Sequence, residues 1–147
     1  MSLQEKLVQD MKSAMKSGDK LALETIRMLR SQIQNASLGK SEPLSDDEVM
    51  QILTKEVKRR QESVQMYSDG GRQDLADREQ AEMELIQAYL PEQLDEAALT
   101  EIIDEILRQT GVISMKEIGR VMGQLMPKIK GRADGKLAQE IVKQKLN

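Results

Sequence analysis

The helical patterns in this chain fall into two groups, separated at residues 89–95 by the sequence YLPEQLD. Pro91 disfavours helix at the residue before it and lacks a backbone donor, so one helix should end here. Asp95 can cap a new helix, because its side chain can accept from the free N–H groups of the first turn. We therefore predict a domain boundary, with an N-terminal domain over residues 1–90 and a C-terminal domain over residues 91–147.

Before this boundary, apolar residues recur every three or four positions, as in amphipathic helices. Gly18 is predicted to stop a first helix and Asp19 to cap a second. After a loop, the residues Ser45 to Glu48 form a capping box that opens a long helix. The pair Gly70-Gly71 breaks this helix, and a fourth helix leads up to the boundary.

After the boundary, the helix that begins at Asp95 is predicted to end at Gly111. A second capping box, Ser114 to Glu117, should start a helix that stops at Pro127, and Asp134 should cap the last helix. No segment alternates as a strand would. We predict an all-α protein, in which an N-terminal helical domain of about four helices precedes a small three-helix C-terminal domain.

The composition excludes several kinds of active site. The 147 residues include no Cys and no His, so disulfides, thiolate or histidine metal sites and histidine-based triads are not available. No GxSxG or GxGxxG pattern is present, and the carboxylates offer no recognisable catalytic pair. Tyr67 and Tyr89 are the only aromatic residues, which argues against base-stacking modules. We expect no cofactor, no metal and no autonomous catalysis.

The chain has no run of eighteen apolar residues, and its first residues lack the apolar region of a signal peptide. We therefore expect a cytoplasmic protein that does not associate with membranes.

Charge is distributed unevenly along the chain. Residues 91–112 hold one basic and six acidic side chains, a net charge of −5, and residues 113–147 hold eight basic and three acidic ones, a net charge of +5. Such a basic tail could meet a phosphate backbone. It could equally dock on the chain's own acidic segment, and charge alone leaves both interpretations open.

Four cations of this tail surround the glycines of a short turn. It is not a Walker motif, because only three residues separate its glycines and Leu137 stands where Ser or Thr binds magnesium. Free backbone N–H groups and the start of the following helix could still hold phosphate. An ordinary turn with solvated lysines explains the spacing equally well. The candidate nucleic-acid-binding residues are Lys128, Lys130, Gly131, Arg132, Gly135 and Lys136.

The preceding helix carries Gly119 and Gly123 four residues apart, with Met122 and Met126 on the adjoining stripe. Glycine inside a helix costs roughly 1 kcal/mol relative to alanine, which suggests a contact that needs the space. We favour packing inside the small domain over contact with a ligand.

Two further groups of cations lie in the N-terminal domain. In the first, Glu56 precedes Arg60 by four residues, which predicts ordinary ion pairs on a solvated helix face; its cations are Lys55, Lys58, Arg59 and Arg60. In the second, Arg27 and Arg30 lie three apart in an otherwise apolar helix, and both a solvated and a binding role remain open.

Several strings, in this order and spacing, resemble the YqeY-like protein family over the whole chain. They are Ile26-Arg27-Met28-Leu29, Gly71-Arg72-Gln73-Asp74-Leu75, Tyr89-Leu90-Pro91-Glu92-Gln93-Leu94, and Gly119 to Met126 with Gly131-Arg132-Ala133-Asp134-Gly135. Residues 91–147 are also similar to the tail domain of the B subunit of the bacterial Asp/Glu-tRNA amidotransferase. Ile118 departs from the family pattern, in which Met commonly precedes the first glycine.

The resemblance implies that the lysines and Arg132 of the turn contact tRNA, because the amidotransferase tail domain helps hold tRNA. The family is associated with carbon–nitrogen ligase activity with glutamine as amido-N-donor, but this chain lacks the amidase Ser-Lys signature, the cradle domain and the ATP site. We expect a tRNA- or RNA-binding accessory protein, with a possible protein partner in translation, that is not an enzyme by itself. The alternatives are a protein–protein adaptor that uses the Gly/Met helix face, or a non-catalytic subunit of an amidotransferase complex.

Overall fold

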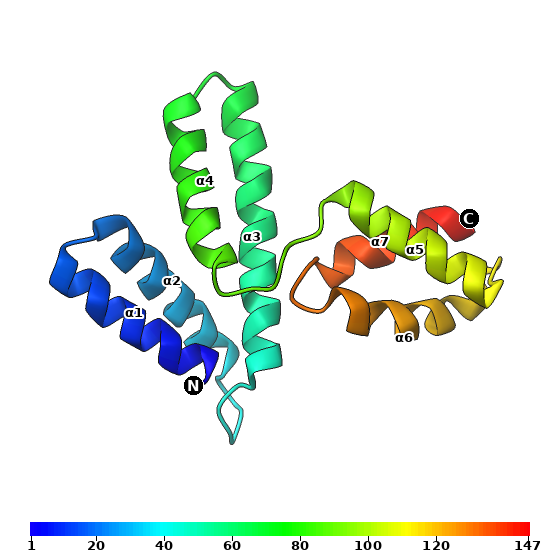
Figure 1. The fold of residues 1–147 in the computed structure, drawn as a ribbon, viewed down its shortest axis with the longest axis horizontal. Helices are drawn as coiled ribbons and strands as arrows, with labels where there is room; N and C mark the ends of the chain where they lie inside the picture. The colour runs from blue at the N-terminus through cyan, green and yellow to red at the C-terminus, as the bar shows by residue number, and fades with distance from the viewer. The chain divides into compact units, whose positions relative to one another are not determined.

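The computed structural model describes residues 1–147 and contains only helices (Figure 1). This confirms the predicted all-α class. In chain order the elements are α1 (Leu3–Ser17), α2 (Lys20–Ala36), α3 (Asp46–Asp69), α4 (Gln73–Gln87), α5 (Glu96–Thr110), the short 3₁₀ helix η1 (Met115–Glu117), α6 (Ile118–Ile129) and α7 (Gly135–Leu146).

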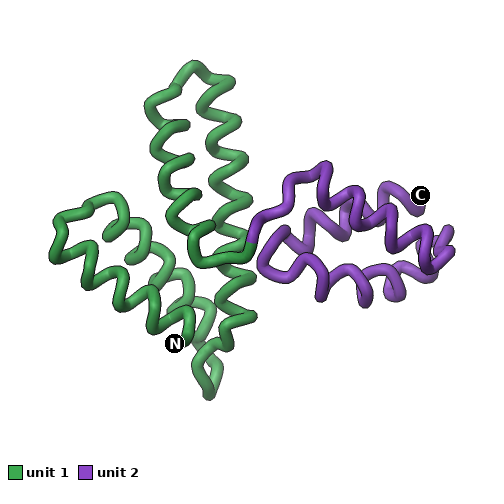
Figure 2. The backbone as a smooth tube through the Cα atoms, viewed as in Figure 1, with its two compact units in different colours: residues 1–91 green, residues 92–147 purple.

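The chain divides into two compact units, Met1–Pro91 and Glu92–Asn147, each with its own apolar core (Figure 2). Unit 1 is built from two helical hairpins, α1–α2 and α3–α4. Each of its four helices buries at least one large aliphatic side chain, among them Leu7, Leu29, Leu53 and Ile86. Each such buried side chain stabilises the folded unit by about 1.5–3 kcal/mol, and these contributions hold the two hairpins together.

Local signals in unit 1 form as the sequence predicts. The Ser45 hydroxyl accepts from the Glu48 N–H at 3.2 Å, and the Glu48 carboxylate accepts from the Ser45 N–H at 3.2 Å, which completes the capping box. Gly18 ends α1 with a φ of 72°, a left-handed conformation that suits glycine. The Asp19 carboxylate caps α2 by accepting from the Ala22 N–H.

The predicted solvated face around Arg60 is wrong for this residue. The Arg60 side chain is only 12% exposed, and its guanidinium donates to Glu56 at 2.6 Å in α3 and to Glu82 at 3.3 Å in α4. Glu56 itself is buried. The spacing of four residues predicted the Glu56 pair, but α4 covers this face, so the pair becomes part of a buried network that joins the second hairpin.

Unit 2 packs α5, α6 and α7 around aliphatic residues such as Ile103, Leu125 and Val142, all fully buried. The first turn of its second helix differs from the prediction. The Ser114 hydroxyl accepts from the Lys116 N–H rather than from Glu117, and the chain makes the 3₁₀ turn η1 before α6 begins. A hydroxyl bonded two residues ahead favours this tighter turn.

The predicted stop at Pro127 is also wrong, because α6 continues through Pro127 to Ile129. Proline lacks the N–H that would bond to the carbonyl four residues earlier, which belongs to the exposed Gly123. Water can reach that carbonyl, so the missing bond is tolerated, and burial of Ile129 favours one further turn of helix.

Candidate nucleic-acid interface

The basic turn, residues 127–136, is shaped by Gly131. Its φ of 71° lies in the left-handed region, which most residues with a side chain avoid. Two bonds close the turn onto the end of α6, because the Ile129 carbonyl accepts from the N–H groups of Arg132 at 2.8 Å and Ala133 at 3.1 Å. Gly131 is therefore a structural residue that fixes the path of the chain between α6 and α7.

The turn is fastened to the residues that precede α5. The Leu94 N–H donates to the Arg132 carbonyl at 2.8 Å, and the Gln93 side-chain amide donates to the Gly131 carbonyl at 2.6 Å. Two segments that are far apart in the sequence, residues 92–94 and residues 131–135, thus meet within unit 2. These bonds hold the backbone of the turn in one conformation, from which the lysine side chains extend.

Arg132 is part of this fastening. Its guanidinium donates through Nε to the Glu92 carbonyl at 3.1 Å and through Nη1 to the Lys128 carbonyl at 3.4 Å. The predicted role of Arg132 was contact with nucleic acid. The structure adds a role that the sequence did not show, because two of its donors are engaged by the chain itself.

The three lysines of the turn are exposed but lie in different electrostatic surroundings. Lys136, at the start of α7, has no ion pair. Lys128 lies beside α5 in a groove of about 650 Å³ whose other charged residues are Glu101, Asp104, Glu105 and Arg108. The pKa of Glu105 is lowered chiefly by its hydrogen bond to Arg108, with a smaller contribution from Lys128.

Part of the basic tail therefore faces the acidic segment of the same chain. Besides Lys128, Lys145 of α7 pairs with Asp104 of α5 at 3.3 Å. Docking on the chain's own acidic segment thus accounts for some cations of the tail, which lie near acidic side chains of unit 2. Lys136 has no ion pair, so binding of a phosphate backbone stays open for this residue.

Gly135 and Asp134 lie at the start of α7. A side chain added at Gly135 would come within 3.0 Å of the terminal methyl group of Met126, a flexible side chain that is 40% exposed. The Asp134 carboxylate caps α7 by accepting from the Leu137 N–H at 3.3 Å. The negative charge of this carboxylate opposes anion binding at the start of the helix. Any attraction of the candidate site for phosphate must therefore come from the lysines rather than from the helix dipole.

The preferred interpretation of Gly119 and Gly123 is wrong. Both are exposed on α6, and a side chain added at either position would meet no atom within 4 Å. The apolar face of α6 that packs in unit 2 uses Val121, Leu125 and Ile129 instead. The glycines thus form an open surface, which continues toward Met126, a side chain that is 40% exposed.

The fold and the turn together define a class, a helical protein whose small three-helix unit presents lysines on a clamped turn. Within that class, the chain belongs to the YqeY-like family, since residues 4–146 match the family described as Yqey-like protein. The resemblance seen in the sequence is thereby confirmed.

Relatives of known sequence extend this assignment. A protein of Pyrenophora tritici-repentis named altered inheritance of mitochondria protein 41, mitochondrial, is 32% identical over 130 residues, which cover 87% of this chain and 71% of the relative. Its namesake from Eremothecium gossypii is 40% identical over 85 residues, 57% of this chain and 46% of that protein. The chain thus spans only part of the length of these relatives.

A shorter match provides the link to the amidotransferase. A glutamyl-tRNA(Gln) amidotransferase subunit from Thermococcus gammatolerans is 39% identical over 57 residues, which cover 36% of this chain but 9% of that protein. This partial match is consistent with the similarity to an amidotransferase tail domain.

The expected cytoplasmic location is contradicted by these relatives. Those that match over most of the chain are named as mitochondrial proteins. The expectation rested on the lack of a recognisable signal peptide, which is weak evidence about compartment. No helix in the structure is both long enough and apolar enough to cross a membrane.

Sequence reasoning missed Glu92 and Gln93 as the residues that hold the turn. Their signal was present in the string YLPEQL, but spacing along the chain does not show that a loop side chain will reach a carbonyl 38 residues away.

Proposed function

We propose that this protein is a tRNA- or RNA-binding accessory protein, in which Lys128, Lys130 and Lys136 contact phosphates. The observation that carries the proposal is the clamped turn, since its backbone is held by Gln93 and Leu94 while its lysines extend into solvent. A preformed arrangement of cations lowers the conformational cost of binding a polyanion. Relationship to a tRNA amidotransferase subunit supports RNA as the polyanion.

The proposed role is binding rather than catalysis. Transamidation chemistry would then belong to other proteins of a complex, to which this chain contributes an RNA-binding unit. Transamidation of charged tRNA by the purified chain alone, with glutamine and ATP, would overturn this part of the proposal.

The test is RNA binding at several salt concentrations by a variant with Lys128→Gln, Lys130→Gln and Lys136→Gln. Arg132 is left intact, because its bonds to Glu92 and Lys128 support the turn. We expect weaker binding to unfractionated tRNA and a salt dependence whose slope falls by about 0.7 for each lost contact to a single strand.

The matched control removes three exposed lysines outside the turn, Lys20, Lys116 and Lys143, by the same change to glutamine. It should bind tRNA nearly as the unaltered protein does. Equal affinity in both triple variants would show that net charge alone governs binding, and that the turn is not the site.

We propose as the second candidate a protein–protein adaptor that uses the open surface of α6. The observation that favours it is the free space over Gly119 and Gly123 beside the exposed Met126. A photo-crosslinking residue at position 123 should fit there without disturbing the fold. Adducts that resist nuclease and contain protein support the adaptor, whereas adducts that contain RNA place this surface in the RNA interface.

A further inference from the structure

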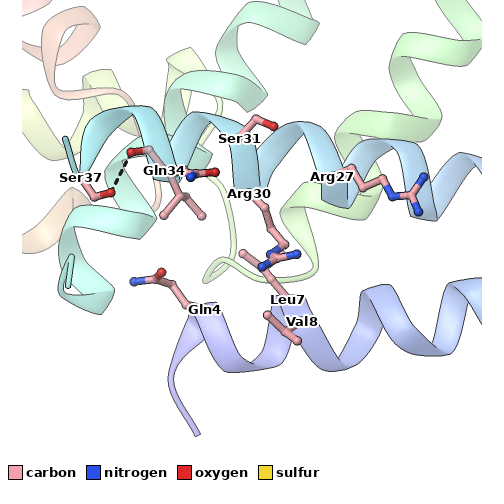
Figure 3. A pocket seen from close by; sticks show the side chains of 9 residues that line it. Gln4, Leu7, Val8, Arg27, Arg30, Ser31, Gln34 and Ser37 are labelled. Carbon is pink, nitrogen blue, oxygen red and sulfur yellow. Dashed lines mark hydrogen bonds between the residues drawn. The ribbon is translucent and has the colours of Figure 1, made fainter.

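The groove between α1 and α2 in unit 1 has no part in the function proposed above. It encloses about 560 Å³, a volume within the roughly 300–1,000 Å³ of small-molecule sites. Leu7 and Val8 of α1 and Ile33 of α2 contribute its apolar part, and polar side chains of both helices line the rest (Figure 3). Arg30 extends from α2 toward α1 across this groove.

The charge of the groove is unusual for this unit. Its lining includes Arg27 and Arg30 but no carboxylate. The other four arginines of unit 1 all pair with carboxylates: Arg59, Arg60, Arg72 and Arg78. Arg27 has no such partner, and the closest polar contact of Arg30 is the Met11 sulfur at 3.3 Å. In a unit with 16 acidic and 13 basic side chains, two arginines that both lack an ion pair are a marked exception.

The donors in the groove fit a tetrahedral oxyanion. A guanidinium offers several N–H groups in a planar fork that suits phosphate. Arg27 and Arg30 lie three residues apart on α2, where the Arg30 guanidinium reaches toward α1 and the Arg27 side chain extends along α2 at the edge of the groove (Figure 3). The Ser31 hydroxyl and the Gln34 amide of α2 are neutral donors among the lining residues, while the Gln4 amide of α1 already donates to the Leu44 carbonyl at 3.1 Å. No aromatic side chain lines the groove, so it offers no aromatic ring on which a base could stack.

We infer that this groove is a phosphate-binding site, in which Arg27 and Arg30 contact the anion and the neutral donors of α2 orient it. The phosphate can come from a free phosphorylated compound or from the phosphodiester backbone of RNA. The site is separate from the basic turn and does not depend on the function of that turn.

The experiment follows the Nε–Hε signals of Arg27 and Arg30 by NMR in the full chain during three titrations. The probes are pyrophosphate, a short oligouridylate and a poly-glutamate peptide. We expect saturable shifts of both signals with at least one phosphate-bearing probe. Pyrophosphate alone identifies a free phosphorylated compound as the source, and oligouridylate alone identifies a phosphodiester. Shifts caused by the peptide alone, or by no probe, would overturn the inference.

Two variants complete the test. Arg27→Gln with Arg30→Gln should weaken binding of the active phosphate probe at least tenfold, while Arg72→Gln with Arg78→Gln removes the same charge from exposed arginines and should leave it unchanged. Equal weakening in both double variants contradicts the site. Repeating the titration in the variant that lacks Lys128, Lys130 and Lys136 separates the two proposals, because the groove should keep its response whether or not the turn binds RNA.

Discussion

Both units contain engaged cations and cations without an ion pair, but Arg60 of unit 1 is engaged by carboxylates and Arg132 of unit 2 by backbone carbonyls. In unit 1, Arg60 is buried against Glu56 and Glu82 and serves packing, whereas Arg27 and Arg30 have no carboxylate partner. In unit 2, Arg132 holds backbone carbonyls while Lys136 extends into solvent. The comparison teaches that a cation buried in an ion pair, such as Arg60, is a poor candidate for binding, and that spacing along the sequence does not reveal which cations are buried in this way.

The largest expected effect is in the buried network of unit 1. Arg60→Ala leaves Glu56 and Glu82 without their shared partner, and we expect the free energy of unfolding of unit 1 to fall by about 3–5 kcal/mol. Because Tyr67 and Tyr89 both lie in unit 1, tyrosine fluorescence during urea unfolding follows this unit.

The control for this variant is Arg59→Ala, since the Arg59 side chain is 68% exposed and its pair with Glu56 should contribute below about 1 kcal/mol. Similar losses for the two variants would mean that burial does not distinguish these arginines, and the contrast drawn above would fail.

The next effect separates two glycines of unit 2. Gly131→Ala places a side chain in left-handed backbone and should destabilise the unit by about 1–2 kcal/mol. Gly123→Ala fills open space on a helix and should stabilise it by up to about 1 kcal/mol. Hydrogen exchange of buried amides in α6 measures both, and a destabilising Gly123→Ala would show that α6 has a neighbour on this face.

A smaller effect tests whether Arg132 supports the turn. Arg132→Lys keeps the charge but loses the planar fork, and we expect a cost of about 1 kcal/mol in unit 2 from weakened bonds to the Glu92 and Lys128 carbonyls. The readout is again exchange of α6 amides, with Lys136→Arg as the control. Unchanged exchange would return Arg132 to the group of cations that are available for binding.

The smallest effect concerns Tyr89, which donates to Asp10 while Lys6 lies over its ring at 5.3 Å. Burial, followed by the bond to Asp10, raises the pKa of Tyr89. In the unfolded chain a tyrosine loses its proton near pH 10. The folded chain keeps the proton, so this contribution to stability is complete below about pH 10 and declines as the pH rises further.

The measurement is the urea midpoint by circular dichroism between pH 8 and 11. Tyr89→Phe should flatten the decline, and Tyr67→Phe should not. An unchanged slope in Tyr89→Phe would mean that the bond to Asp10 does not affect the ionisation of Tyr89.

The sequence predicted elements that depend on local chemistry. The capping box at Ser45, the stop at Gly18 and the all-helical class follow from bonds between near neighbours, and the structure confirms them. The predictions from the sequence were wrong where the burial of a residue depends on an element that is distant in the chain. The burial of Arg60 depends on α4, and the open face of Gly119 depends on α5 and α7 packing against another side of α6.

The candidate site was predictable only as a set of residues. The lysines, Gly131 and Gly135 stood together in the sequence, but their support by Gln93 and Leu94 joins segments almost forty residues apart. The groove of Arg27 and Arg30 was equally hidden, because it needs α1 to lie against α2. Whether the lysines bind RNA stays a prediction.

The bonds between residues 92–94 and the basic turn also determine where the chain can be divided for study. A fragment that starts at Asp95 retains α5, α6 and α7 but lacks the partners of Gly131 and Arg132. Its helices would form while the loop that joins α6 to α7 loses its attachment, so a negative binding result with that fragment would be misleading. Dissection of this protein should therefore keep Glu92 with the C-terminal piece, even though the helix begins at Glu96.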